Sequence, residues 1–324
     1  MQMNKAMMIK QQKGIALITI LVMVALATIL AATIAKRQAA TAESTAYLMR
    51  QNQSLMYAKS AEAFFSELLV DDAENAAEVD HLNETWAQPM PAFPVEDGYV
   101  SGILQDESGK FNLNSLITAE GTVNENAKAW FELILKRAGL PEQLSEAVID
   151  WQDEDEMPSG PMGAESIYYQ GLPNGSLPPN AKFHSVEELK LVRGFEENKY
   201  KLIAPYLSTA SVAADTKVNI NTASAFLLAS MDEKLDVNAV QQLLDHRQAN
   251  LEYFSNVADL WTLEPFAQVD AAKHNLFNNL LGVQSNHFKA RIEVMLSERK
   301  RQFSSDLVRQ DKKVYVAYRS MAPF

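Results

Sequence analysis

The sequence contains no cysteine and only five histidines among its 324 residues. Disulfides, cysteine nucleophiles and cysteine-ligated zinc are therefore excluded, and a histidine-based metal site is disfavoured. Positive charge is also scarce, with 29 Lys and Arg against 41 Asp and Glu, which gives a net charge of −12. Because such a chain repels phosphate backbones, broad nucleic-acid binding is disfavoured. The 47% of apolar residues is nevertheless ordinary for a globular protein of one or two domains.

One long apolar run lies near the N-terminus. Residues 1–14 carry three lysines and no acid, and Ile15–Ala35 then continues for 21 residues without a charge. A helix of this length crosses a hydrocarbon core of about 30 Å, and the preceding lysines follow the positive-inside pattern. A buried core helix and a cleaved secretory signal peptide are the alternatives, but the apolar region of a signal peptide is usually shorter. We expect a membrane anchor.

The helical composition continues beyond this anchor. Residues 37–69 contain neither Gly nor Pro, so one helix is predicted from Ile15 to about Val70. Its part after the anchor carries apolar side chains that need cover from the chain's own sheet or from a partner protein. The partner contacts that we expect are Leu55, Phe64, Phe65 and Leu68.

Alternating polar and apolar residues predict strands on both sides of a helical region. The predicted strands are Gly98–Asp106, His287–Ser297 and Val314–Arg319. Pro89–Pro94 predicts a linker or an extended run. The expected fold class is α+β, in which a long, pilin-like N-terminal helix packs on a small antiparallel sheet.

The expected domains follow from this pattern. A large all-α domain is inserted at residues 107–283. Residues 36–106 supply the rest of the long helix, a linker and the first strand, and residues 284–324 supply the last strands.

The helical region contains an internal duplication. The matching segments are FNLNSL (111–116) with VNINTA (218–223), AVIDWQ (147–152) with QLLDHR (242–247), and FHSVEEL (183–189) with FSNVADL (254–260). Short helical hairpins can resemble one another by chance, but three pairs in the same order favour a true duplication. We expect two repeats of the SAM-like or helix-hairpin-helix-like kind, with Asn and Ser/Thr capping the helices.

The first copy carries about 24 extra residues, and this insert is acidic at its start. Five carboxylates fall within Asp150–Glu156, and residues 157–179 hold nine of the chain's 24 Gly and Pro. Packed carboxylates repel one another unless a cation lies among them. Carboxylate and carbonyl oxygens without His or Cys favour Ca²⁺, whereas Mg²⁺ is less suited because it keeps its waters. Trp151 and Tyr168–Tyr169 favour a packed loop over the alternative, a solvated helix end.

The expected calcium ligands come from this insert. They are Asp153, Asp155, Glu165, a carbonyl near Met157 and, for a second ion, Asn174. Asp150 is expected to orient its own helix end, because the second copy keeps Asp245 without the loop. A glycosidase-like carboxylate pair is a weaker interpretation, since calcium accounts for the turns as well as the acids.

The start of the apolar run resembles a processing site. Lys13-Gly14-Ile15-Ala16-Leu17 is similar to the type IV prepilin family, in which a prepilin peptidase cuts after the Gly and leaves the apolar helix in place. The resemblance implies a leader at residues 1–14 and a mature chain that starts at Ile15 and is often N-methylated. Most pilins have a Glu five residues into the mature chain, where this sequence has Thr19.

Several motifs together resemble one family, the K-type minor pseudopilins of type II secretion. They are the Gly14–Ile15 site without the Glu, the two Asn-x-Asn runs, Asp150-Trp-x-Asp-x-Asp155 and Gly163-Ala-Glu-x-x-Tyr-Tyr169. The resemblance implies a complex with I-type and J-type minor pseudopilins at the pseudopilus tip, which initiates pseudopilus assembly for the export of folded proteins. It also implies bound calcium, contact with other pseudopilins, and a single-pass inner-membrane location with the C-terminal region in the periplasm.

The sequence also bears on two other function classes. We expect no enzyme, because the sequence contains no Gly-rich phosphate loop, G-x-S-x-G or H-E-x-x-H motif. The alternative function is a DNA-binding helix-hairpin-helix module on a membrane anchor, as in DNA uptake or a type IV pilus minor pilin. Val218–Ala223 resembles the opening of such modules, but the hairpin stretch Ser230–Lys234 has two acids and no Gly. We therefore expect the fold without nucleic-acid binding.

Overall fold

The computed structural model describes residues 15–75, 78–173, 175, 177–210, 217–310 and 312–321. The predicted leader at 1–14, including Gly14, and the predicted ligand Asn174 lie outside these described residues. Contacts divide the chain into two units between Met56 and Tyr57.

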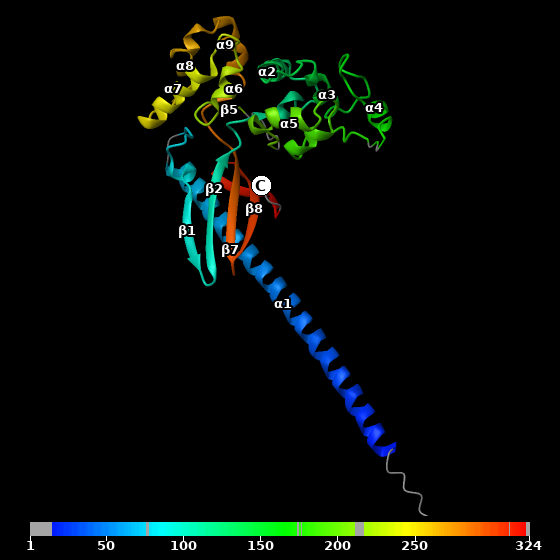
Figure 1. Cartoon of the computed structure of the whole chain (residues 1–324). Coiled ribbons are helices and arrows are strands. Elements are labelled where there is room, and N and C mark those ends of the chain that lie inside the picture. Colours follow the sequence, from blue (N-terminus) through cyan, green and yellow to red (C-terminus); the bar gives the residue numbers. More distant parts are fainter. Residues whose placement is uncertain are drawn as a thin grey trace, which may run out of the picture. The chain divides into compact units, whose positions relative to one another are not determined.

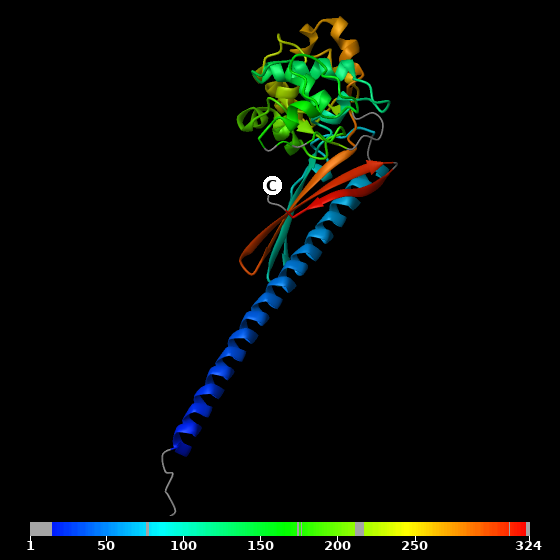
Figure 2. The same ribbon diagram turned by 90° about the vertical axis from the view of Figure 1, so that its right-hand side faces the viewer.

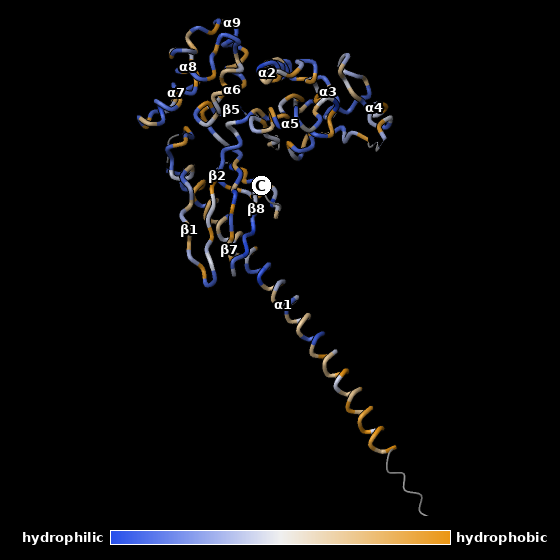
Figure 3. Tube along the Cα trace, in the orientation of Figure 1, coloured by the Kyte–Doolittle hydropathy of each residue, from blue (hydrophilic) through white to orange (hydrophobic). Residues whose placement is uncertain are grey.

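Helix α1, Ile15–Asn75, is a single element of 61 residues, which confirms the predicted long helix. Its most apolar 18-residue window has a mean hydropathy of 2.8 and no buried residue, so it meets the length and composition of a membrane span. Figure 3 shows this hydrophobic stretch at the N-terminal end of α1. The hydroxyl of Thr19 donates to the Ala16 carbonyl oxygen at 2.9 Å, so its polar group is satisfied within the helix.

A five-stranded antiparallel sheet forms the core of the second unit, in the order β1-β2-β7-β8-β9. The strands are β1 (Met90–Val95), β2 (Gly98–Asp106), β7 (His287–Leu296), β8 (Arg299–Gln310) and β9 (Lys313–Ser320). The neighbours β2 and β7 are joined by the whole helical domain, which lies at one end of the sheet (Figures 1 and 2). The insertion predicted from the sequence is therefore present in the fold.

Two strands of this five-stranded sheet, β8 and β1, were not predicted from the sequence. Strand β8 reads RKRQFSSDLVRQ and buries only Phe303, Ser305 and Leu307, so its alternation is hidden by polar residues. Strand β1 contains Pro91 and Pro94, which favour a linker in sequence but are tolerated in a strand at a sheet edge.

The part of α1 after Tyr57 packs on one face of this sheet (Figure 2). Phe65 and Leu69 are 0% exposed. A Cβ atom added at Gly102 would lie 3.1 Å from the Phe65 ring, so the glycine makes room for the aromatic side chain. Phe65 therefore belongs to the chain's own core, and its prediction as a partner contact is corrected. The sequence pattern shows which residues are apolar but not which of them the sheet covers.

The helical domain consists of short elements. Its α-helices are α2 (Glu125–Arg137), α3 (Leu144–Asp150), α4 (Ser166–Gln170), α5 (Glu197–Ile203), α6 (Ala225–Ala229), α7 (Val237–Ala249), α8 (Val257–Leu260) and α9 (Ala271–Asn278). Its strands are β3 (Phe111–Asn112), β4 (Leu207–Ser208), β5 (Val218–Asn219) and β6 (Leu281–Gly282). The 3₁₀ helices of the chain are Thr85–Ala87, Leu113–Leu116, Val186–Leu191, Ala204–Tyr206 and Phe266–Gln268.

Two repeats of equivalent topology make up this domain, here called the first repeat (111–208) and the second repeat (218–282). Each is closed by a parallel strand pair, β3 with β4 and β5 with β6. In the first, the Asn114 side chain accepts from the Phe183 amide at 2.7 Å and donates to its carbonyl at 2.9 Å. The Asn221 side chain brackets the Phe254 backbone in the same way: it accepts from the Phe254 amide at 2.7 Å and donates to the Phe254 carbonyl at 3.1 Å. Two of the three matched segment pairs thus make matched contacts. The third pair differs, because Asp150 is buried at the end of α3 and Asp245 is exposed within α7.

One hydrophobic core spans both repeats. The Trp130 ring of α2 meets Phe277 of α9 edge-on at 5.6 Å, and its indole N–H donates to the Ser230 hydroxyl at 2.9 Å. Both residues of the first contact are 1% exposed. The repeats are therefore two halves of one folded domain rather than two independently folded domains.

Candidate metal centre

The insert of the first repeat is held by two carboxylates on α3. Asp150 accepts the Ser159 amide at 3.0 Å with one oxygen and the Ala164 amide at 2.7 Å with the other. One turn earlier, Glu146 accepts the Met162 amide at 2.7 Å. Asp150 therefore fixes the insert, not its own helix end, which corrects the role expected from the sequence.

Three carboxylates converge inside this loop. One oxygen each of Asp150, Asp153 and Glu165 lie within 4.8 Å of one another. Glu165 is 4% exposed, and within the described residues neither of its oxygens has a hydrogen-bond partner. One oxygen of Asp153 is likewise buried and without a partner there. Buried carboxylate oxygens that lack donors are costly, and a divalent cation bound by oxygen ligands would satisfy them.

The electrostatics of the site agree with this geometry. Burial, together with the nearby charges of Asp150, Asp155 and Glu156, raises the pKa of Asp153 to about 7. Burial, together with the same group of acids, also raises the pKa of Glu165 to about 7. The loop thus brings negative charge together without a compensating Lys or Arg, which is the arrangement that a hard cation stabilises.

The other predicted ligands are placed differently. Asp155 is exposed, lies outside the cluster of three, and accepts the Met157 amide at 2.7 Å. The Met157 side chain is 76% exposed. The structure thus brings Asp153 and Glu165 together, but with Asp150 in place of Asp155. Asp150 was not predicted as a ligand, because its counterpart in the second repeat, Asp245, is present without the insert.

An aromatic shell packs the loop, as the sequence predicted. The Trp151 ring meets the Tyr169 ring edge-on at 5.3 Å. The Arg193 guanidinium donates to the Gly163 carbonyl at 2.8 Å and lies 4.8 Å from the centre of the Tyr168 ring. Arg193 was not predicted, since a single cation 28 residues beyond Glu165 gives no local signal.

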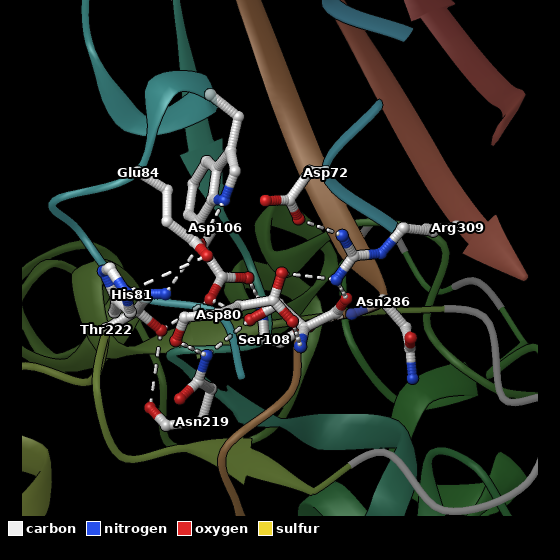
Figure 4. Close-up of polar contacts among 12 residues, drawn as sticks. Asp72, Asp80, His81, Glu84, Asp106, Ser108, Asn219, Thr222, Asn286 and Arg309 are labelled. Carbon is white, nitrogen blue, oxygen red and sulfur yellow. Dashed lines mark hydrogen bonds and ion pairs between the residues drawn. The ribbon is translucent and has the colours of Figure 1, made fainter. Parts of the chain in front are cut away.

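A second acidic group lies where the sheet meets the second repeat, and it is here called the polar junction (Figure 4). Arg309 of β8 donates to Asp72 at 2.7 Å, to Asp80 and to the Ser285 carbonyl at 2.7 Å. Glu84 completes the acidic group. Because Arg309 already supplies a positive charge to Asp72 and Asp80, this group forms an ion-pair network and needs a metal ion less than the insert does.

The polar junction also contains Asp106 at the end of β2. It accepts the hydroxyls of Ser285 and Thr222, each at 2.5 Å, and the Ser108 amide at 2.7 Å. Asn219 of the second repeat donates to the Asp80 carbonyl at 3.0 Å. These contacts tie the second repeat to the sheet and to the linker after α1.

A candidate partner surface lies beside β1. Phe64 is 40% exposed and Phe93 is 49% exposed, and their rings meet edge-on at 6.2 Å. Leu68 is half-buried on the same part of α1, and Leu55 is half-buried in the first unit. Phe93 was missed because its proline-rich segment predicted a linker.

Comparisons with known proteins agree on one family. Two sequence profiles described as type II secretion system (T2SS), protein K, match residues 109–211 and 218–284, which coincide with the two repeats. The type II secretion system protein K of Pseudomonas aeruginosa is 32% identical over 96% of this chain and 93% of its own length. That of Aeromonas hydrophila is 29% identical over 96% and 97%.

A solved structure shares the fold. A chain in the crystal structure of the GspK-GspI-GspJ complex from the enterotoxigenic Escherichia coli type 2 secretion system matches with a TM-score of 0.76. It is 23% identical, and the match covers 86% of this chain and 99% of that chain. By sequence and by fold, the chain belongs to the type II secretion system protein K family.

Proposed function

We propose that this chain is a minor pseudopilin that joins I-type and J-type pseudopilins in a tip complex. This complex initiates pseudopilus assembly, which exports folded proteins across the outer membrane. The observation that carries the proposal is the fold shared over 86% of the chain with a member of the GspK-GspI-GspJ complex. The role is structural rather than enzymatic.

The architecture supports a position at the end of a fibre. The helical domain is inserted between the neighbouring strands β2 and β7, so it widens the molecule at one end of the sheet (Figure 1). A domain of this bulk fits at the tip more readily than between stacked subunits. Because the bulk of the domain supports a position at the tip, we assign its SAM-like or helix-hairpin-helix-like repeats a scaffolding role.

DNA binding has no comparable support. In the hairpin stretch of the second repeat, Asp232 pairs with Lys273 at 2.7 Å, and Glu233 pairs with Lys136. Lys273 and Lys136 are thus paired with acids of this hairpin, whereas phosphate binding needs cations that are available.

The first unit supplies the membrane anchor. We propose that Ile15–Ala35 crosses the inner membrane once, that the C-terminal region lies in the periplasm, and that a prepilin peptidase removes residues 1–14. The apolar window of α1 supports the span. Intact-mass measurement with and without the peptidase tests the processing, because cleavage after Gly14 leaves Ile15 as the first residue, with or without a methyl group.

We further propose that the insert binds Ca²⁺. Asp150, Asp153 and Glu165 would hold it, and the buried oxygens without partners are the observation that supports this site. A bound ion would offset part of the negative charge of these three carboxylates and stabilise the folded domain. Asp155, the Met157 carbonyl and Asn174 stay predictions as further ligands.

Co-purification tests the tip complex. The full chain is co-expressed with I-type and J-type pseudopilins and extracted in detergent, and the complex is captured through one partner. Phe64→Asp is expected to reduce recovery of this chain at least tenfold, because a charge would enter an apolar contact with Phe93 and the partner.

Ile103→Asp is the matched control. Ile103 is 37% exposed, close to the 40% of Phe64, but it follows Gly102 and therefore points to the opposite face of the sheet. Recovery unchanged by Phe64→Asp would contradict the proposed surface. Failure of the unmutated chain to co-purify would contradict the tip function itself.

A further inference from the structure

Large apolar side chains gather on the insert, beyond the candidate metal centre. Ile167 of α4 is 86% exposed and Met157 is 76% exposed. Leu172 and Leu177 are 43% and 63% exposed. Monomeric proteins expose single apolar residues freely, whereas exposed apolar side chains that lie together mark an interaction surface. The hydrogen bond between Ser166 and Glu156 brings the segments of Met157 and Ile167 together. Figure 1 places α4 at the end of the first repeat that is remote from α7 of the second.

Hydrogen bonds hold the parts of the insert that carry Met157 and Ile167. The Ser166 hydroxyl donates to Glu156 at 2.8 Å, which joins the neighbours of Met157 and Ile167. The Tyr169 hydroxyl accepts the Arg193 amide at 3.2 Å, and Tyr169 is 2% exposed. The loop thus has a buried side that fixes it and an outer side that displays apolar groups. A surface presented in this way loses little conformational freedom when a partner binds.

Negative charge borders the apolar groups. Glu154, Asp155 and Glu156 are all exposed and directly precede Met157. A second copy of this chain would bring the same acids against them, and an anionic lipid surface would also be repelled. Charge complementarity therefore favours a partner that presents Lys or Arg beside apolar side chains.

We propose that this corner, residues 154–157 with Ile167 and Leu172, is a docking surface for a basic, apolar segment of another protein. The apolar side chains provide the buried contact, and the acids select basic flanks and speed association. The surface is separate from the Phe64–Phe93 face and does not depend on the tip function.

The test uses the full chain in detergent and two fluorescent peptides, one of alternating Leu and Lys and one of alternating Leu and Glu. Anisotropy titration is expected to show binding of the lysine peptide and none of the glutamate peptide. Combined Ile167→Ser and Met157→Ser should weaken the lysine peptide roughly tenfold, as expected when buried apolar area is lost. Glu154→Lys should weaken it as well.

Leu251→Ser is the matched control, because Leu251 is 72% exposed but lies in the second repeat. It should leave peptide binding unchanged. Equal binding by the unmutated chain and the Ile167/Met157 variant would overturn the proposal. So would a dimer in sedimentation that Ile167→Ser dissolves, which would identify a second copy as the occupant, or binding to phosphatidylglycerol vesicles that the same change removes.

Discussion

The two repeats share one scaffold and use it differently. In both, an Asn side chain brackets the backbone of a buried Phe, Asn114 with Phe183 and Asn221 with Phe254. In the first repeat, a long insert follows Asp150 and buries three acids together. In the second, the corresponding Asp245 is exposed and bonds only to Gln241 in the described contacts, at 2.7 Å. The longer connection of the first repeat therefore forms a candidate ion site, and no such group of acids is found among the described residues of the second repeat.

The first Asn of each Asn-x-Asn run shows the same divergence. Asn112 donates at 3.2 Å to the carbonyl of Ala210, just beyond β4, which ties the two ends of the first repeat together. Asn219 donates instead to the Asp80 carbonyl and to the Ser285 hydroxyl, at 3.0 and 2.7 Å. One repeat thus uses this side chain internally, and the other uses it to attach the domain to the sheet.

The largest expected effect is a loss of stability that differs between Asn114→Ala in the first repeat and Asn221→Ala in the second. Asn114→Ala leaves the amide and carbonyl of Phe183 without this partner at a site where Asn114 is 1% exposed, so we expect a loss of about 3 kcal/mol in the free energy of unfolding. Asn221 is half-buried, and water can replace part of its bonding, so Asn221→Ala should cost about 1–2 kcal/mol. Urea denaturation of both variants measures the difference. Equal losses would mean that the brackets are equally shielded from water.

The next effect is the stabilisation of the folded chain by calcium. Calcium at about a hundred times its dissociation constant should stabilise the unmutated chain by about 2.7 kcal/mol, and chelator should reverse this. Asp153→Asn should abolish the response, and in chelator it should raise the melting temperature, because it removes a buried charge whose pKa is raised.

Asp245→Asn provides the comparison in the second repeat, where the residue is exposed and no metal cluster is found among the described residues. It should leave the calcium response intact. A response lost equally in both variants would remove the distinction between the repeats, and no response in the unmutated chain would remove the calcium site.

The last effect, which is spread over a range of pH, tests the attachment of the second repeat. Burial raises the pKa of Asp106 to about 6, against the hydrogen bonds of Ser285 and Thr222, which lower it. The folded state therefore holds this proton more tightly than the unfolded chain, so stability is lost as the pH rises from about 4 through about 6. A shift from 3.8 to about 6 corresponds to a loss of about 3 kcal/mol.

Asp106→Asn removes this titration while keeping one acceptor oxygen. The stability of the unmutated chain relative to this variant should therefore fall between about pH 4 and pH 7.5, as measured by thermal unfolding at each pH. A constant difference would show that Asp106 is ionised throughout this range.

Local patterns in the sequence were sufficient for much of this protein. The uncharged run of Ile15–Ala35 and the absence of Gly and Pro after it predict one long helix, because helix formation depends on neighbouring residues. Alternation likewise predicted β2, β7 and β9, and three ordered segment pairs predicted the duplication. These signals are local, so each segment carries its own evidence.

Tertiary structure alone decided what packs against what. Phe65 is a core residue because Gly102 lies beneath it, and Phe93 joins the exposed surface because a proline-rich edge strand places it beside Phe64. Asp150 replaced Asp155 in the acidic cluster because its helix end is buried by the insert that it holds. Side-chain burial depends on residues far apart in the chain, and a local pattern contains no record of them.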